Sequence, residues 1–449
     1  MTGEPEPKRD WLEMLLLILV VVIILVHPTS KAFSLAWLGR LLGFSEKIVE
    51  KAPRLTLADI LIWLAGALLF LRILLRREFR LLRGVRPAAV LLVALTIASM
   101  LFAQNKLSAI ADVIQYLEYF IVCYLVLVIV LGTRGRLEKF TWLWLALGLY
   151  VVLAGLVHYV KTGRAAVDVS STFLNRNILS GYLAMTLPFA WGMILHYDYL
   201  SARLAWLVLI AVGLVVVLAG GPWIAAVIGI LVVSVIRSRK LLPVVLLALL
   251  ILVVGAFPLL PRNNTAVLAK SIYPFHEELK TENPLDRVNP RYIEWQAAAK
   301  FLTPGYHREL GISRATHLRQ LLLGVGIGNY QLNVGRFYGY LPNPNENTVE
   351  PDTHNVYLVL AVSVGIPAML AFLWLVGSFL RRAALGYART DDPFLRGLLL
   401  GCTGALTSIL ITNIFTSTLI HGTGPAMILV FAFAAAGARL AERKSIAAE

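Results

Sequence analysis

Cysteine and charged residues are both scarce in this chain, and each shortage excludes a class of protein. The two cysteines, Cys123 and Cys402, lie in apolar segments, so the sequence indicates neither a disulfide framework nor a cysteine metal site. Charged residues make up only 15% of the chain and hydrophobic residues 58%, which is too apolar for a soluble protein of 449 residues. The composition therefore predicts an all-α protein that crosses a membrane many times.

Acidic residues are scarcer than basic ones, and the formal net charge is +15. A basic excess of this size is also found in proteins that bind nucleic acid. Here the basic residues cluster in short links between apolar runs, so we expect them to face a membrane surface and expect no nucleic-acid partner. The basic links are residues 76–86, 133–139, 237–240 and 381–396.

Apolar runs of about 20 residues, the length of a spanning helix, recur along the chain and predict about twelve transmembrane helices. With twelve spans, the basic links and both termini fall on one side, which the positive-inside rule makes the cytoplasm. The first run follows Lys8 and Arg9 and lacks a clear small-x-small cleavage site, so it predicts a retained helix. The spans are expected to start near residues 11, 57, 87, 113, 140, 178, 204, 222, 241, 354, 395 and 418.

One link, residues 260–353, is much longer than the others and falls on the outer side by the same count. Its aromatic residues and helix signals predict a folded, partly helical loop. A helix is expected from Pro290, with Asn289 as its N-cap, and a second helix over residues 313–322. We expect three parts: N-terminal transmembrane helices (1–259), the outer loop domain (260–353) and C-terminal transmembrane helices (354–449).

An ionisable residue, His354, stands where this loop meets the next apolar run. Asp352 or Thr353 is expected to cap the following helix, which puts His354 in its first turn. The unpaired N–H groups and the dipole at a helix start disfavour a positive charge, so the imidazole is expected to be neutral, as a general base requires. The same helix end attracts anions. The alternative is an interfacial histidine that only caps or packs.

Arginine and asparagine side chains are candidate partners for an anionic substrate. Arg287 and Arg291 lie just before and within the first predicted loop helix, and Arg176 and Asn177 stand at the outer mouth of another apolar run. A guanidinium group makes paired, charge-assisted bonds to phosphate. For each arginine the alternative is a solvated or snorkelling side chain. The histidines show no metal-ligand spacing, so neither a metal nor a cofactor is expected.

Three glycines alternate in "GVGIGN", residues 324–329, and look like part of a nucleotide-binding fingerprint. That interpretation requires a strand before the glycines and a βαβ unit around them, and the sequence predicts neither. The glycines are instead expected to form a tight turn under the loop domain.

Three motifs together resemble the O-antigen ligase and polymerase superfamily of bacterial envelope glycosyltransferases. In order, they are "FLNRN" (173–177), "RYIEWQAAAKFL" (291–302) followed by "LLLGVGIGNYQ" (321–331), and "HNVYLVLAVSVGIP" (354–367). The likeness covers roughly residues 140–440. The chain departs from the family at "AGGPW" (219–223), where members often carry Ser-Arg-Gly, and at Ser363, where an acidic residue is common.

The resemblance implies a GT-C-like enzyme of the bacterial inner membrane with its active site in the periplasm. It implies metal-independent, inverting transfer of a glycan from a polyprenyl diphosphate, undecaprenyl diphosphate, to an acceptor hydroxyl. His354 matches the family's general base, and Arg291 matches an arginine that stabilises the diphosphate. The substrate-binding residues expected beside them are Arg176, Asn177, Arg287 and Asn355.

The acceptor stays open at this level. A lipid A-core acceptor, which we favour, would make the protein an O-antigen ligase. The end of another glycan would make it a polysaccharide polymerase, and a protein hydroxyl would make it a protein O-oligosaccharyltransferase. A different class, a lipid-linked sugar flippase or transporter, is expected to show internal repeats and ionisable groups near the bilayer midplane. In this sequence the ionisable residues are expected at helix ends.

Overall fold

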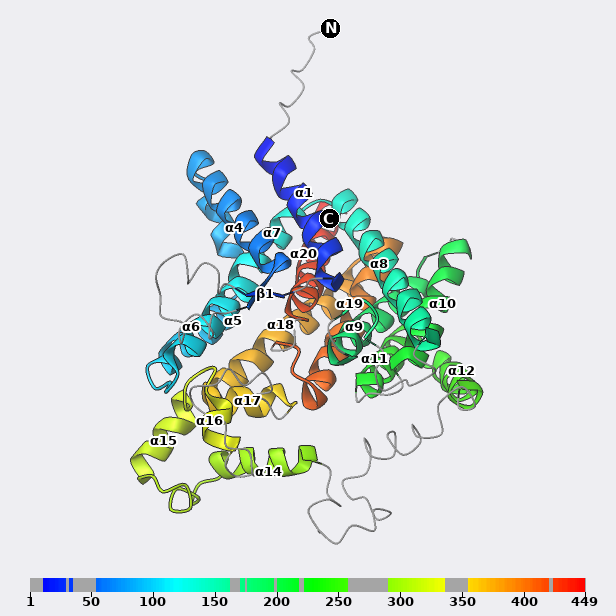
Figure 1. Ribbon diagram of the computed structural model, residues 1–449. Helices are drawn as coiled ribbons and strands as arrows, with labels where there is room; N and C mark the ends of the chain where they lie inside the picture. The colour runs from blue at the N-terminus through cyan, green and yellow to red at the C-terminus, as the bar shows by residue number, and fades with distance from the viewer. Residues whose placement is uncertain are drawn as a thin grey trace.

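The computed structural model describes residues 11–29, 32–34, 54–161, 170–173, 176–197, 200–217, 222–256, 290–335, 354–419 and 423–448. Within these ranges the chain is helical apart from turns and one pair of short strands, so the predicted all-α class is confirmed for the described part (Figure 1). Strand β1 (Ala32–Ser34) pairs antiparallel with β2 (Arg54–Thr56), with Ala32 opposite Thr56.

Apolar helices lie at the predicted runs. Within the described residues, 6 helical segments are long and apolar enough to cross a membrane, and five shorter apolar helices accompany them. The count of about twelve spans stays a prediction. The six segments are Leu57–Arg76, Lys106–Val130, Arg134–His158, Ile366–Arg389, Pro393–Phe415 and Gly424–Arg443. The shorter ones are Trp11–Val26, Pro87–Met100, Ala202–Leu214, Pro222–Arg237 and Leu241–Leu252.

Helices of the N-terminal half begin at or before their expected starts. Two of them begin well ahead, at Lys106 and Arg134, because polar first turns extend the helix beyond its apolar window. A π segment, η3, interrupts the second long one. The elements are α1 Trp11–Val26, η1 His27–Thr29, α4 Leu57–Arg76, η2 Phe79–Gly84, α5 Pro87–Met100, α6 Lys106–Leu117, η3 Glu118–Cys123, α7 Tyr124–Val130, α8 Arg134–Lys161, α9 Arg176–Ile194, α10 Leu200–Val217, α11 Pro222–Arg237 and α12 Leu241–Ala256.

The loop and the C-terminal part follow. In Figure 1 the loop helices gather at the bottom of the view, while α1 begins and α20 ends near the top. The described loop elements are α14 Pro290–Leu302, α15 Arg314–Leu323 and α16 Tyr330–Val334. The C-terminal elements are α17 Val356–Ser363, α18 Ile366–Arg389, α19 Pro393–Phe415 and α20 Gly424–Ala448.

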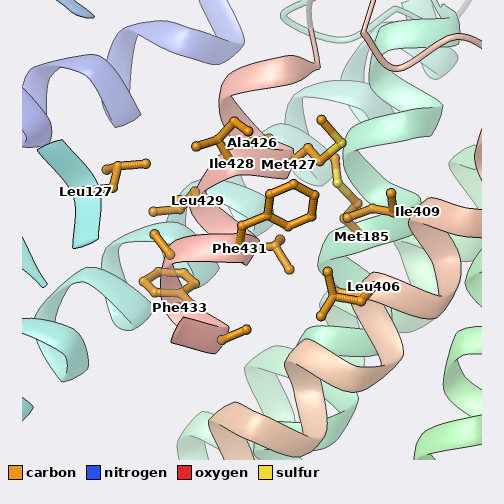
Figure 2. Packing of buried hydrophobic residues seen from close by; sticks show 14 of the residues in the cluster. Leu127, Met185, Leu406, Ile409, Ala426, Met427, Ile428, Leu429, Phe431 and Phe433 are labelled. Carbon is orange, nitrogen blue, oxygen red and sulfur yellow. The ribbon is translucent and has the colours of Figure 1, made fainter. Parts of the chain in front are cut away.

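The main core forms around α20, which is buried between helices from all parts of the membrane region. Figure 2 shows Met427 and Phe431 of α20 beside Met185 of α9 and Ile409 of α19, with Leu127 of α7 on the opposite side of α20. A buried, apolar helix of this kind is surrounded by protein on every side and is not a lipid-facing span. The last helix of the chain therefore completes the core.

Close backbone contact holds α9 against α19. A Cβ added at Gly192 would lie 2.3 Å from the backbone nitrogen of Gly401. Helices in membranes often associate through small residues because backbones can then approach closely. Helix α11 packs on the same pair, and Ser408 Oγ donates to Ala225 O at 2.8 Å across the contact.

The ionisable residues do not all gather at helix ends, and that expectation is wrong. Glu118 lies inside the Lys106–Val130 segment with 2% of its surface exposed. Its Oε2 accepts a hydrogen bond from Trp63 Nε1 of α4 at 3.0 Å. A buried carboxyl within an apolar segment needs such a polar partner. Hydropathy along the chain missed this residue because the apolar residues around it dominate the average.

The loop domain has a small core of its own. Helix α14 begins at Pro290 and α15 at Arg314, with Ser313 as its N-cap, so both predicted loop helices are confirmed, while Asn289 lies outside the described residues. The core residues are Ala297, Ala298, Phe301, Leu310, Val325, Tyr330, Val334, Val359 and Val362. The last two belong to α17, so this loop core includes the first helix after the loop.

The apolar run after the loop is two helices, and the span expected near residue 354 starts later. Helix α17 has only 8 residues, and the chain then turns at Gly365, whose φ of 109° is outside the range of other residues. The candidate span is α18, which begins at Ile366. The last span likewise begins at Gly424 and not near 418. Average hydropathy cannot detect such a break because Gly365 is flanked by apolar residues.

Candidate functional site

A single turn places His354 and Asn355 at the start of α17. Asn355 is the N-cap: its Oδ1 accepts from Tyr357 N at 3.0 Å and from Leu358 N at 3.1 Å. The expected caps, Asp352 and Thr353, lie outside the described residues. His354 is half-buried and precedes the helix with a left-handed φ of 51°. It is therefore outside the first turn, contrary to expectation, because Asn355 takes the capping position.

Helix α17 is held between the two cores. Val359 and Val362 face the loop core, whereas Val356 and Leu360 belong to the main membrane core. Tyr357 Oη donates to Leu410 O of α19 at 2.6 Å, which ties the helix to the membrane region. A helix packed on both sides has little freedom to move, so the turn that carries His354 leads into a fixed helix.

The glycine motif forms a tight turn against the far end of α17, and this prediction is confirmed. Val325 N donates to Val362 O and Gly326 N donates to Ser363 O, both at 2.9 Å. Gly324 faces the same segment closely: an added Cβ would lie 2.1 Å from Ser363 O. The turn thus pairs with the last residues of the helix that His354 precedes, which explains its glycines without a nucleotide.

The same turn also contacts the corner between α5 and α6. Asn105 N donates to Asn329 Oδ1 at 2.6 Å, and Asn329 Nδ2 donates to Ile327 O at 2.8 Å. Asn329 is 1% exposed, so these bonds satisfy an amide that burial would otherwise penalise. The backbone comes equally close, since a Cβ at Gly326 would lie 2.4 Å from Ala103 Cα. The only local sign of this role in the sequence is the position of Asn329 directly after Gly328.

The remaining predicted site residues fall on two helix starts. Arg291 is the second residue of α14, and Arg176 and Asn177 are the first two residues of α9. Asn177 is half-buried, while the side chains of both arginines and the whole of Arg287 lie outside the described residues. Helix α14 packs against α17, which brings the helix of Arg291 beside the helix that follows His354. Helix α9 instead packs against α19 and α11.

One loop arginine has a structural partner. The guanidinium of Arg319 on α15 lies 4.2 Å from the ring centroid of Phe102, in the turn that follows α5. An arginine stacked on an aromatic ring gains a cation–π attraction. On the same helix, the buried His317 places Nε2 2.8 Å from Phe301 O of α14. These side chains fix the loop helices to one another and to α5. Across the described residues, no three His, Cys, Asp or Glu side chains gather as a metal site.

A comparison with known families gives a match to the region that contains the His354 turn. A family model described as O-antigen ligase matches residues 205–373, from α10 to the first part of α18. The matched region includes the loop helices, the glycine turn and His354. A comparison with curated proteins gives no match. The O-antigen ligase match over residues 205–373 thus agrees with the superfamily that the motifs of this chain resemble.

Proposed function

We propose that the protein is a glycosyltransferase of the bacterial inner membrane that moves a glycan from undecaprenyl diphosphate to an acceptor hydroxyl on the periplasmic face. The observation that carries the proposal is the matched O-antigen ligase region, which contains His354 directly before α17, a helix that packs in both cores. The sugar–phosphate bond of the donor already has a good leaving group. The protein therefore has to orient the substrates, accept one proton and stabilise one leaving anion.

His354 is the proposed general base. The acceptor oxygen attacks the anomeric carbon while the bond from that carbon to the diphosphate oxygen breaks. The acceptor proton passes to the imidazole, which contributes as a positioned base does in other enzymes. One direct displacement inverts the configuration at the anomeric carbon. A histidine directly before a short helix that packs in two cores suits this task because the helix limits its movement while the residue stays half-buried.

Arginines are the proposed cations for the departing diphosphate. Arg291 and Arg176 would stabilise the growing negative charge, with Arg287 as a reserve candidate. Helix α14, which carries Arg291, packs against α17, and this contact supports its assignment more than that of the other two. Asn177 and Asn355 complete the proposed substrate-binding set. The Oδ1 of Asn355 is already the cap of α17, so any contact with substrate would use another part of this residue.

We favour a lipid A-core acceptor, and therefore an O-antigen ligase. A polysaccharide polymerase and a protein O-oligosaccharyltransferase use the same donor chemistry, and the acceptor surface decides between them. A donor–acceptor incubation separates them, since a ladder of products indicates a polymerase and a single block transfer indicates a ligase.

The second candidate is a lipid-linked sugar transporter. Glu118 favours it, because buried carboxyl groups inside spans often line ion or proton paths. The Trp63 indole donates a hydrogen bond to one oxygen of this carboxyl, so Glu118 has a structural role as well.

One experiment separates transferase from transporter. The full chain is purified in detergent and incubated with lipid-linked donor and acceptor, with no membrane and hence no ion gradient. A transferase forms glycosylated acceptor and releases polyprenyl diphosphate in equal amounts. If the donor is unchanged while the same preparation still binds it, the transferase proposal is wrong.

A further inference from the structure

An apolar groove runs along α4, between this helix and the η3–α7 segment. The α4 wall extends from Trp63 to Ile73, Leu82 of η2 closes one end, and Ile121 and Leu125 line the facing wall. The groove has a volume of about 370 Å³. Phe70, 58% exposed, stands at its rim, so the groove opens on the outer surface of the helical region.

At the floor of the groove, α4 and η3 lie so close together that no additional side chain fits between them. A Cβ added at Gly66 would lie 2.4 Å from Val122 Cγ1 of the π segment η3, so α4 approaches η3 directly there. The inner end is fixed by Trp63, whose indole donates to Glu118 Oε2 at 3.0 Å. π segments inside helices are frequent at functional sites. The close contact of α4 with η3 therefore defines the floor of the groove, and the Trp63–Glu118 hydrogen bond fixes its inner end.

The other end of the groove opens beside a basic cluster. Arg76 lies one turn beyond Ile73 in α4, and Arg80 stands two residues before Leu82 in η2. Both are exposed, as is Arg77 between them. The neighbouring Arg72 is partly neutralised, since its Nε lies 3.2 Å from Glu78 Oε2. The exposed arginines thus form a positive site at the end of an apolar channel.

The length of the groove matches one leaflet of a bilayer. Trp63 and Ile73 are ten residues apart in a helix, a rise of about 15 Å. The hydrocarbon core of a bilayer is about 30 Å thick, so the groove reaches from the arginine end to about the midplane. A polyprenyl chain is much longer than this and would not be contained. An acyl chain of a phospholipid fits, and the arginines complement an anionic head group.

We propose that this groove binds one acyl chain of an anionic phospholipid, with its phosphate among Arg76, Arg77 and Arg80. The lipid fills the space between α4 and η3–α7 and ties the first helices of the chain to the rest of the membrane core. This site is independent of the proposed transfer reaction, because none of its residues belongs to the His354 turn or to the loop domain.

Native mass spectrometry of the purified full chain tests the proposal. The probes are phosphatidylglycerol and phosphatidylcholine with identical acyl chains. We expect phosphatidylglycerol to bind more tightly. Replacing two arginines, Arg76→Gln with Arg80→Gln, should weaken its binding by about 25-fold, since each surface arginine contributes roughly fivefold. The matched control, Arg237→Gln with Arg239→Gln, removes two arginines from the α11–α12 link and should leave binding unchanged.

A second variant tests the apolar part separately. Ala67→Trp places a large ring in the groove without changing any charge, so it should abolish phosphatidylglycerol binding while thermal unfolding in detergent stays cooperative. Equal binding of the two lipids by the unmodified protein would overturn the proposal. Equal losses of phosphatidylglycerol binding in the two arginine double variants would also overturn it, because they would indicate a general effect of surface charge. Full binding by the Ala67→Trp variant would overturn it as well.

Discussion

Two adjacent residues have different roles at the start of α17. Asn355 satisfies two backbone N–H groups of the helix, and His354 takes the left-handed conformation that lets the chain enter the cap. The sequence predicted a histidine beside a helix start and a capping residue next to it. It did not predict which residue caps, because Asp352, Thr353 and Asn355 all have side chains that cap well. The difference of one position decides whether His354 is in the helix or before it.

The capping role of Asn355 gives a prediction at this scale. Asn355→Ala removes the acceptor for Tyr357 N and Leu358 N, and we expect a loss of about 1–2 kcal/mol in the free energy of unfolding. Asn355→Asp keeps an acceptor oxygen at the same place and should restore most of it. Denaturant unfolding in detergent measures both. Equal stability of the alanine variant and the unmodified protein would show that the Asn355 cap does not stabilise the fold.

At the scale of elements, the glycine turn connects the loop domain, α17 and the α5–α6 corner. The sequence predicted a tight turn from three alternating glycines, and predicted both loop helices from their capping signals. It did not predict what the turn packs against, because Ala103 and Asn105 are more than 200 residues away in the chain. The break at Gly365 was missed for a related reason: this residue, with φ 109°, lies closely against Leu322 of another helix, where an added Cβ would be 2.3 Å from Leu322 O.

Gly326→Ala tests this connection. The new Cβ would meet Ala103 Cα at 2.4 Å, so we expect the turn to move off α5–α6 and the amides of α15 and α16 to exchange hydrogen faster. Transfer activity should fall with it, because the turn also holds α17. The matched control is Gly305→Ala, where φ is nearly the same (107° against 106° at Gly326) but nothing lies within 4 Å of the added Cβ. If both variants exchange alike, backbone strain and not docking explains the effect.

For the whole molecule, composition and hydropathy predicted an all-α membrane protein and the positions of its apolar helices. These follow from local sequence, because the bilayer selects apolar stretches of a set length. The packing order does not follow from local sequence. The central position of α20 and the packing of α9 against α19 depend on small residues that are far apart in the sequence and meet in the fold, as Gly192 meets Gly401. The candidate site combines a local motif at His354 with packing against helices that are distant in the sequence.

The proposed mechanism depends on His354, which takes the proton of the acceptor hydroxyl. Its most direct test is the single-turnover rate of glycan transfer by His354→Ala, measured together with donor binding. We predict a rate loss of about 10²–10⁴-fold with donor affinity retained. In the same assay Arg291→Ala should weaken donor binding, and His307→Ala, a change at another loop histidine, should leave both quantities near those of the unmodified protein. Transfer by His354→Ala at a near-normal rate would show that His354 is not the general base.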